Sequence, residues 1–213
     1  MPGIPDIRKE YKLKKLTEDQ VATDPFAQFG IWWKEAETSG VDEANAMTLA
    51  TASSDGIPAA RIVLLKGFDQ QGFVFYSNYD SFKGKQLTEN PRACLVFFWK
   101  ELERQVRITG ISGKLTAEEN NEYFRSRPEG SRIAAWASPQ SQAIPGRDWL
   151  DTRETEFREK FRGKEITRPP HWGGYRVRPI TVEFWQGRPN RLHDRLQYSL
   201  DENGSWILER LAP

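Results

Sequence analysis

The stretch ARIVLLKGFDQQGFVFYSN, residues 60–78, decides the fold class. Its first part is rich in Ile, Val and Leu and its last part in Phe, Val and Tyr, residue types that favour strands. Between them, Asp-Gln-Gln-Gly at 69–72 is a turn signal. The stretch therefore predicts a strand, a turn and a β-hairpin, which is typical of an antiparallel sheet.

The rest of the chain adds strands and helices to this hairpin. Further strands are predicted at 46–53, 93–99, 104–115, 175–186, 190–200 and 205–211. Helices are predicted at 25–40, 81–90, 117–127 and 148–163. The segment 93–99, ACLVFFW, is apolar enough to predict burial on both faces. Pro128 is predicted to end the helix at 117–127. We predict an α+β protein around an antiparallel barrel, with a single domain at 23–213 and a mobile segment at 1–22.

Composition excludes several classes of protein. Lys and Arg number 31 and Asp and Glu number 30, so a net charge of +1 gives no reason to expect nucleic acid as a partner. No apolar run is long enough to cross a membrane, and the single Cys94 suits a reducing compartment, so we expect a cytoplasmic protein. His171, His193 and Cys94 lack the spacing of metal ligands, so no metal site is expected, although carboxylates alone could hold a weak Mg²⁺. Dinucleotide-binding, P-loop and nucleophile-elbow motifs are absent from the sequence.

Three groups of side chains are candidates for binding anions. They are Arg61 with Lys66, Lys83 with Lys85, and Tyr123 with Arg127 and Ser131. The first brackets an apolar strand, the second follows a helix start, and the third combines hydroxyl and guanidinium groups at a helix end, as phosphate sites do. Ordinary solvated surface charge is the alternative for each group.

Near the C-terminus, the sequence NRLHDRLQYSL brings together Arg191, His193 and Arg195. In an extended strand these three side chains share one face. Two guanidinium groups beside an imidazole repel each other unless an anionic or electron-rich partner lies against them. The row therefore predicts a functional face. Gln140 and Ser141, in a separate part of the sequence, by themselves indicate only a polar loop.

Nine motifs in order resemble the pyridoxamine/pyridoxine 5′-phosphate oxidase family, the FMN enzymes that make pyridoxal 5′-phosphate. They are RIVLLK (61–66), VFYSN (74–78), ERQVRITG (103–110), YFRSRP (123–128), QS (140–141), WGGYRV (172–177), EFWQG (183–187), RLHDR (191–195) and RLAP (210–213). RKEY at 8–11 extends the resemblance to nearly the whole chain. Such a member is expected to be a split β-barrel with flanking helices, assembled as a homodimer with FMN at the interface.

The resemblance also implies which residues bind the two ligands. The residues expected to bind FMN are Arg61, Ile62, Val63, Leu64, Leu65, Lys66, Tyr76, Ser77, Lys83, Gln105, Gln140, Ser141, Trp185 and Arg195. Those expected to bind the phosphorylated substrate are Arg8, Tyr11, Lys66, Tyr123, Arg127, Ser131, Arg191 and His193, with Arg191 and His193 as the catalytic pair. One departure stands out: Phe82 occupies a position where the family has a basic residue near the FMN phosphate, and Lys83 or Lys85 would have to compensate.

The implied reaction is oxidation of pyridoxamine or pyridoxine 5′-phosphate by O₂. Hydride passes from the 4′ carbon to flavin N5, and the products are pyridoxal 5′-phosphate and hydrogen peroxide, with ammonia from the amine. Two alternatives stay open: a phenazine-pathway FMN oxidase on the same fold, and a non-catalytic barrel that binds flavin or pyridoxal phosphate. The first has less need of Lys66, Tyr123 and Arg127 together, and the second would tolerate loss of Arg191 and His193.

Overall fold

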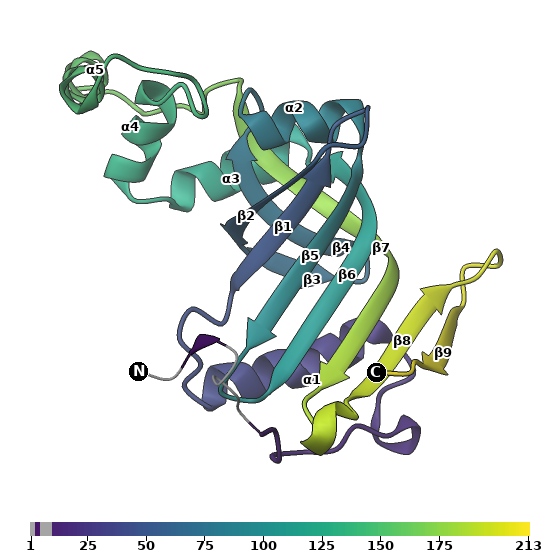
Figure 1. The fold of residues 1–213 in the computed structure, drawn as a ribbon. Coiled ribbons are helices and arrows are strands. Elements are labelled where there is room, and N and C mark those ends of the chain that lie inside the picture. The colour runs from purple at the N-terminus through teal and green to yellow at the C-terminus, as the bar shows by residue number, and fades with distance from the viewer. Residues whose placement is uncertain (1–2, 5–9) are drawn as a thin grey trace.

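The computed structural model describes residues 3, 4 and 10–213, and within them nine strands form one antiparallel sheet (Figure 1). The strands are β1 (Ala46–Ala52), β2 (Pro58–Leu64), β3 (Gly67–Asp69), β4 (Gly72–Asn78), β5 (Arg92–Trp99), β6 (Arg104–Lys114), β7 (Trp172–Gln186), β8 (Asp194–Leu200) and β9 (Trp206–Arg210). The order is β2-β1-β5-β6-β7-β4-β3, with β8 added to β7 and β9 to β8. The sheet curls around a core, which confirms the predicted α+β split barrel.

The longest strand, β7, explains why the barrel is split. Its first residues pair with β4, from Trp172 opposite Asn78 to Val177 opposite Phe73. Its last six residues pair with β8 on the same edge, while β6 pairs with the other edge from Tyr175 to Gln186. The sheet therefore divides where β7 exchanges one neighbour for another, and β7 joins both ends of the molecule.

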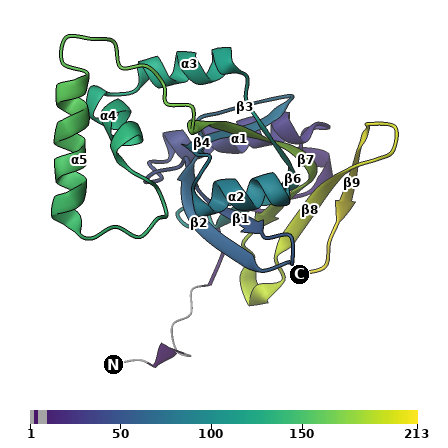
Figure 2. The same cartoon turned by 90° about the horizontal axis from the view of Figure 1, so that it is seen from above.

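Helices cover the concave face and one side of the barrel. They are α1 (Pro25–Thr38), α2 (Phe82–Glu89), α3 (Ala117–Ser126), α4 (Glu129–Ala137) and α5 (Arg147–Lys160). Asp24 begins α1 by accepting hydrogen bonds from the backbone of Phe26 and Ala27, and Phe29 and Trp32 bury the helix against the sheet. Seen from above, α4 and α5 form a lobe beside the barrel (Figure 2), and they enclose a small core with Phe124 of α3.

One helix was missed by the sequence analysis, and one burial prediction does not hold within the single chain. Pro128 ends α3 but serves as the N-cap of α4, a helix that the sequence reading missed. The segment 93–99 is not buried on both faces: in β5, Leu95 and Phe97 are fully buried, whereas Phe98 on the opposite face is 55% exposed. The apolar outer face therefore remains accessible in a single chain.

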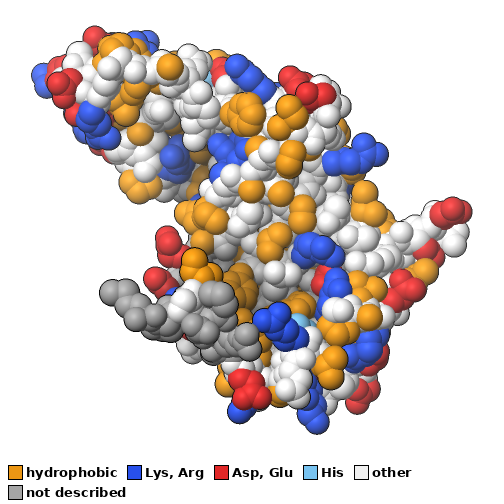
Figure 3. Space-filling model, viewed as in Figure 1, with side chains coloured by type: hydrophobic (Ala, Val, Ile, Leu, Met, Phe, Trp, Pro, Cys, Tyr) orange, Lys and Arg blue, Asp and Glu red, His pale blue; other side chains and the backbone are white. Residues whose placement is uncertain are grey.

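This outer face carries a broad apolar surface. Ile62, Leu64, Phe98, Ile111 and Ile180 are its large exposed side chains. Figure 3 shows hydrophobic side chains spread over this face, with Lys and Arg side chains among and around them. Apolar surface of this extent is typical of a protein–protein interface.

The N-terminal part of the chain runs along the end of the barrel, where Leu16 joins the core. The predicted mobility of residues 1–22 stays a prediction. Over the described residues, no helix is long and apolar enough to cross a membrane. The same residues contain no group of three or more His, Cys, Asp or Glu side chains placed to hold a metal ion.

Candidate functional site

A cavity of about 490 Å³ lies where β2, β4, α2 and α3 meet. It is lined by Arg61, Ile62, Val63, Leu64, Lys66, Tyr76, Ser77, Asn78, Lys83, Tyr123, Arg127, Gln140 and Trp172. Five of the nine motifs, which are far apart in sequence, therefore meet in one place. Asn78 and Trp172 were not among the predicted site residues, although both stand in motifs that the sequence reading had singled out.

Two cations lie side by side in this cavity. Lys83 is 9% exposed, and burial together with the charge of Arg61 lowers its pKa. Arg61 donates to Thr51 Oγ1 at 2.6 Å and to backbone carbonyls, and burial lowers its pKa as well. Across the described part of the chain, neither forms an ion pair. Two half-buried cations without a carboxylate favour binding of an anion.

The positions of Phe82 and Lys85 bear on whether Lys83 or Lys85 could replace the basic residue that the family has at position 82. Phe82 is the first residue of α2 and is 55% exposed, outside the cavity lining. Lys85 is exposed and also outside the lining. Lys83 is therefore the α2 cation that lines the cavity together with Arg61.

Three aromatic rings form a second wall of the cavity. The rings of Tyr76 and Tyr123 are stacked with centroids 3.8 Å apart, and the nearly parallel ring of Trp172 lies 5.3 Å from Tyr76 and 6.2 Å from Tyr123. Burial, with a smaller contribution from Tyr123, raises the pKa of Tyr76 to about 12, so its hydroxyl stays protonated. The guanidinium of Arg127 lies 4.5 Å from the Trp172 ring centre. Arg127 Nη1 is buried, and no described group accepts a hydrogen bond from it.

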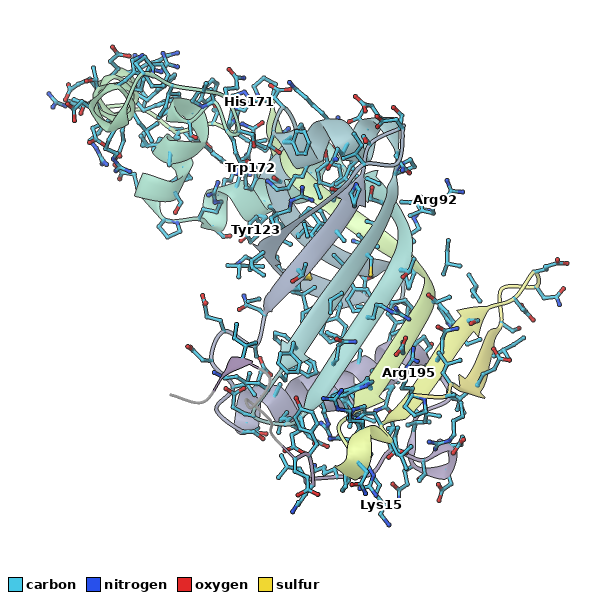
Figure 4. All side chains as sticks on the ribbon, viewed as in Figure 1. Lys15, Arg92, Tyr123, His171, Trp172 and Arg195 are labelled. Atoms are coloured by element: carbon cyan, nitrogen blue, oxygen red, sulfur yellow. The ribbon has the colours of Figure 1, made fainter. Side chains whose placement is uncertain are left out.

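The other predicted site residues gather at the far end of β7. Gln105, Trp185 and Arg195 occupy one row across β6, β7 and β8, because each is directly opposite the next. Figure 4 shows Tyr123 and Trp172 near one end of the barrel and Arg195 near the other. β7 is 15 residues long, which at about 3.3 Å per residue places Trp172 and Trp185 roughly 40 Å apart along the strand. One small molecule cannot touch both groups in a single chain.

The predicted row of Arg191, His193 and Arg195 on one strand face is wrong. Only Arg195 lies in β8, because the strand begins at Asp194. Arg191 ends a short 3₁₀ turn, Pro189–Arg191, with a left-handed φ of 61° that follows a φ of 55° at Asn190. Consecutive non-glycine residues in this region are strained, and such strain is concentrated at functional sites.

His193 is held in one orientation. Its Nδ1 atom accepts a hydrogen bond from the backbone N–H of Arg188 at 3.1 Å, so the neutral ring carries its proton on Nε2. Burial, followed by the charge of Arg191, lowers the pKa of His193. The ring packs against Trp185 with centroids 4.6 Å apart. At neutral pH His193 therefore presents a hydrogen-bond donor.

The partner of Arg195 is a residue that the sequence reading missed. Glu183 is 3% exposed and accepts from Arg195 Nε at 2.8 Å and Nη2 at 3.2 Å. The same carboxylate is bonded to Arg107. Glu183 lies two residues before Trp185 on β7, and this spacing, which puts both on one face, was the signal available in the sequence. The hydrogen bond that Arg195 donates to Glu183 raises the pKa of Arg195.

The remaining predicted residues are distributed as follows. Leu65 is buried in the core and Ser131 lies on α4, both outside the cavity lining. Ser141 has a left-handed φ of 69°, and Gln140 Oε1 accepts from the backbone of Asn78 at 3.4 Å. Tyr11 packs edge-on against Trp185 and His193 at the far group. Arg8 lies outside the described residues.

The fold and this site define a split-barrel protein with a cavity lined by cations and aromatic rings. Residues 34–161 match the family model described as pyridoxamine 5′-phosphate oxidase, and residues 172–213 match the pyridoxine 5′-phosphate oxidase C-terminal dimerisation region. The chain belongs to the pyridoxamine 5′-phosphate oxidase family, which is a family of oxidoreductases. The resemblance predicted from the motifs is thereby confirmed.

Relatives and solved structures agree with this assignment. Proteins named pyridoxine/pyridoxamine 5′-phosphate oxidase from Bordetella pertussis (strain Tohama I) and Salinibacter ruber (strain DSM 13855) are both 56% identical to this chain. They cover 99% and 100% of it, and 100% of their own lengths. The crystal structure of PhzG from Burkholderia lata 383 in complex with tetrahydrophenazine-1-carboxylic acid is similar with a TM-score of 0.88 and 32% identity, over 94% of this chain and 99% of that one. An FMN-binding protein from Nostoc punctiforme shares the fold, with a TM-score of 0.70, 17% identity and coverage of 91% and 100%.

Proposed function

We propose that this protein is an FMN-dependent oxidase that converts pyridoxamine and pyridoxine 5′-phosphate to pyridoxal 5′-phosphate with O₂. The observation that carries the proposal is the cavity in which four cations and an aromatic stack face one space without a carboxylate partner for Arg61, Lys66, Lys83 or Arg127 among the described residues. Such a site fits phosphorylated aromatic molecules. The single Cys94 suits action in the cytoplasm.

The cavity residues fit the two halves of FMN. Arg61 and Lys83 would hold the phosphate, since both are half-buried or buried cations without a carboxylate. Ile62 and Leu64, which are 64% and 37% exposed, offer a flat apolar wall for the ring system. Ser77 and Gln140 supply neutral hydrogen bonds at the same cavity. Each charge-assisted bond to the phosphate contributes about 1.5–3 kcal/mol.

The substrate phosphate has its own candidates. Lys66, Tyr123 and Arg127 line the same cavity from β2–β3 and α3, on the side of the aromatic stack. The buried Nη1 of Arg127 is a donor that a phosphate oxygen would satisfy. Ser131, on the neighbouring helix α4, is our remaining candidate for this phosphate.

We propose a homodimer that completes the site. The cavity group and the far group lie at opposite ends of β7 and must come from two copies to act on one ligand. The apolar outer face with Ile62 and Phe98 supplies the contact surface, and the match of residues 172–213 to a dimerisation region supports it. In a two-fold dimer each copy gives its cavity to one site and its far group to the other.

Arg191 and His193 would act on the substrate ring. When bound, FMN would supply the acceptor for a hydride from the 4′ carbon, with O₂ as the final oxidant and hydrogen peroxide as its product. His193 donates from Nε2 and would position the 4′ hydroxyl or amine, whose proton leaves as the carbonyl or imine forms. Arg191 would orient the ring by its fixed charge. The imine from the amine hydrolyses to the aldehyde and ammonia.

The second candidate is oxidation of a reduced phenazine. The 32% identity to PhzG, which was crystallised with tetrahydrophenazine-1-carboxylic acid, favours it. That ligand has a carboxylate and no phosphate ester, so it leaves Lys66, Tyr123 and Arg127 with less to bind. We therefore place it second.

One assay distinguishes the candidates. The purified protein should show a flavin spectrum and form aldehyde and hydrogen peroxide from each phosphorylated B6 vitamer under O₂. Activity on a dihydrophenazine alone would favour the second candidate. A colourless protein that stays inactive with added FMN would favour a non-catalytic binding role.

A further inference from the structure

The segment of residues 11–16, called the N-terminal strap below, is held in place by hydrogen bonds from its backbone; we call this hold the grip. Glu103 Oε2 accepts hydrogen bonds from the N–H groups of Lys12 at 2.8 Å and Leu13 at 3.1 Å. Asp194 Oδ2 accepts from the N–H of Leu16 at 3.1 Å. Both carboxylates belong to the barrel, so the position of the strap is set by distant parts of the chain.

Glu103 is itself rigidly placed. It is 3% exposed and has a left-handed φ of 54°, which is strained for a residue with a side chain. Its carbonyl oxygen accepts from the backbone N–H of Gly187 at 2.7 Å and from Gln186 Nε2 at 3.2 Å. The turn between β5 and β6 is therefore fastened to the end of β7, which carries Trp185.

The strap places one aromatic ring. The Tyr11 ring lies edge-on to Trp185, with centroids 5.7 Å apart, and edge-on to His193 at 5.9 Å. A Cβ atom at Gly187 would lie 2.6 Å from Tyr11 Cγ and 2.8 Å from its Cβ. These atoms are at the base of the side chain, so the strap backbone would have to move. Only glycine at 187 leaves room for Tyr11 in this position.

We propose that Glu103 and Gly187 are positioning residues of the oxidase site. Glu103 grips the backbone next to Tyr11, and Gly187 leaves the space that the ring occupies. Together they fix Tyr11 against the Trp185–His193 pair and thereby form the wall against which the phosphorylated pyridine ring binds. The last step rests on the proposed function, whereas the grip on the strap does not.

Amide hydrogen exchange on the FMN-loaded protein tests the grip. In Glu103→Ala the amides of Lys12 and Leu13 should exchange at least about tenfold faster than in the wild type, because their acceptor is gone. In Glu103→Gln the exchange rates of these amides should lie between those of the wild type and Glu103→Ala, since an amide oxygen accepts a hydrogen bond but carries no charge. The matched control is Glu101→Gln, which changes a carboxylate in the same turn whose ion pair is with Lys100. Wild-type exchange at Lys12 and Leu13 in Glu103→Ala would overturn the proposal.

Kinetics test the effect on the site. Gly187→Ala should raise the KM for pyridoxine 5′-phosphate about tenfold and change kcat less than about twofold, because uniform binding is lost. Tyr11→Gly should do the same, and the double variant should be no worse than Tyr11→Gly alone, since the clash needs the Tyr11 side chain. Effects that multiply in the double variant would refute the role of Gly187. Absence of turnover in the wild type would instead refute the proposed function, and the exchange rates would still decide whether Glu103 grips the strap.

Discussion

Replacing Lys83 with Met should weaken FMN binding and stabilise the protein without FMN. Lys83 is 9% exposed, lies next to Arg61 and forms no ion pair within the described residues. Methionine has a similar length and removes both the buried charge and its repulsion with Arg61. With a phosphate bound, the same change loses a charge-assisted hydrogen bond of about 1.5–3 kcal/mol. The Kd for FMN should therefore rise by roughly 10- to 150-fold.

Two measurements, both starting from the FMN-free protein, check the expected loss of FMN affinity and the expected gain in stability. Quenching of flavin fluorescence gives the Kd, and thermal unfolding gives the change in stability, which should be a rise in Tm of a few degrees. Lys85→Met is the matched control, because Lys85 is on the same helix but exposed and outside the cavity. Its Kd should equal that of the wild type. An unchanged Kd in Lys83→Met, or equal losses in both variants, would refute the assignment of Arg61 and Lys83 to the phosphate.

Three further changes probe the rest of the site. Arg191→Ala should lower kcat by about a hundredfold or more and leave FMN bound, as turnover and the flavin spectrum of one sample would reveal. Burial and the charge of Arg191 lower the pKa of His193, so its ring is neutral at pH 7; protonation at lower pH would remove the Nδ1 acceptor for Arg188, so kcat/KM should fall only well on the acid side of neutrality, and a flat acid limb in the pH profile would contradict this role. Phe98→Glu places a charge on the apolar outer face and should convert dimer to monomer in sedimentation, with loss of activity; an active monomer would exclude a shared site.

Much of the fold could be read from local patterns. The stretch at 60–78 folds into the predicted strand, turn and hairpin, as β2, β3 and β4 show. Helix α4 was missed because proline was taken only as a helix end, whereas Pro128 also provides the N-cap of the next helix. Burial of β5 on both faces does not hold within the single chain, because no other element of the described chain covers its outer face, where Phe98 is 55% exposed.

The site was harder to predict than the fold. The cavity residues are identified by motifs, but the meeting of β2, α2 and α3 depends on the barrel closing, which no single motif encodes. The alternation in NRLHDR predicted one strand face, yet Asn190 and Arg191 adopt left-handed turns and shift the start of β8 to Asp194. Glu183 was overlooked because its partners are cross-strand neighbours, and strand register is not visible in a sequence.

The placement of the two residue groups at opposite ends of β7 has a consequence for dimers formed from two different variants. In a two-fold dimer, a subunit damaged at Lys83 and a subunit damaged at Arg191 would put both lesions into one site and leave the other intact. At an FMN concentration too low to load the Lys83 variant, the two variants refolded as a mixture should therefore recover roughly a quarter of the wild-type rate, since half of the randomly formed pairs are mixed and each mixed pair has one intact site. Recovery of activity in such a mixture would show that the two altered residues belong to different groups, one at each end of β7.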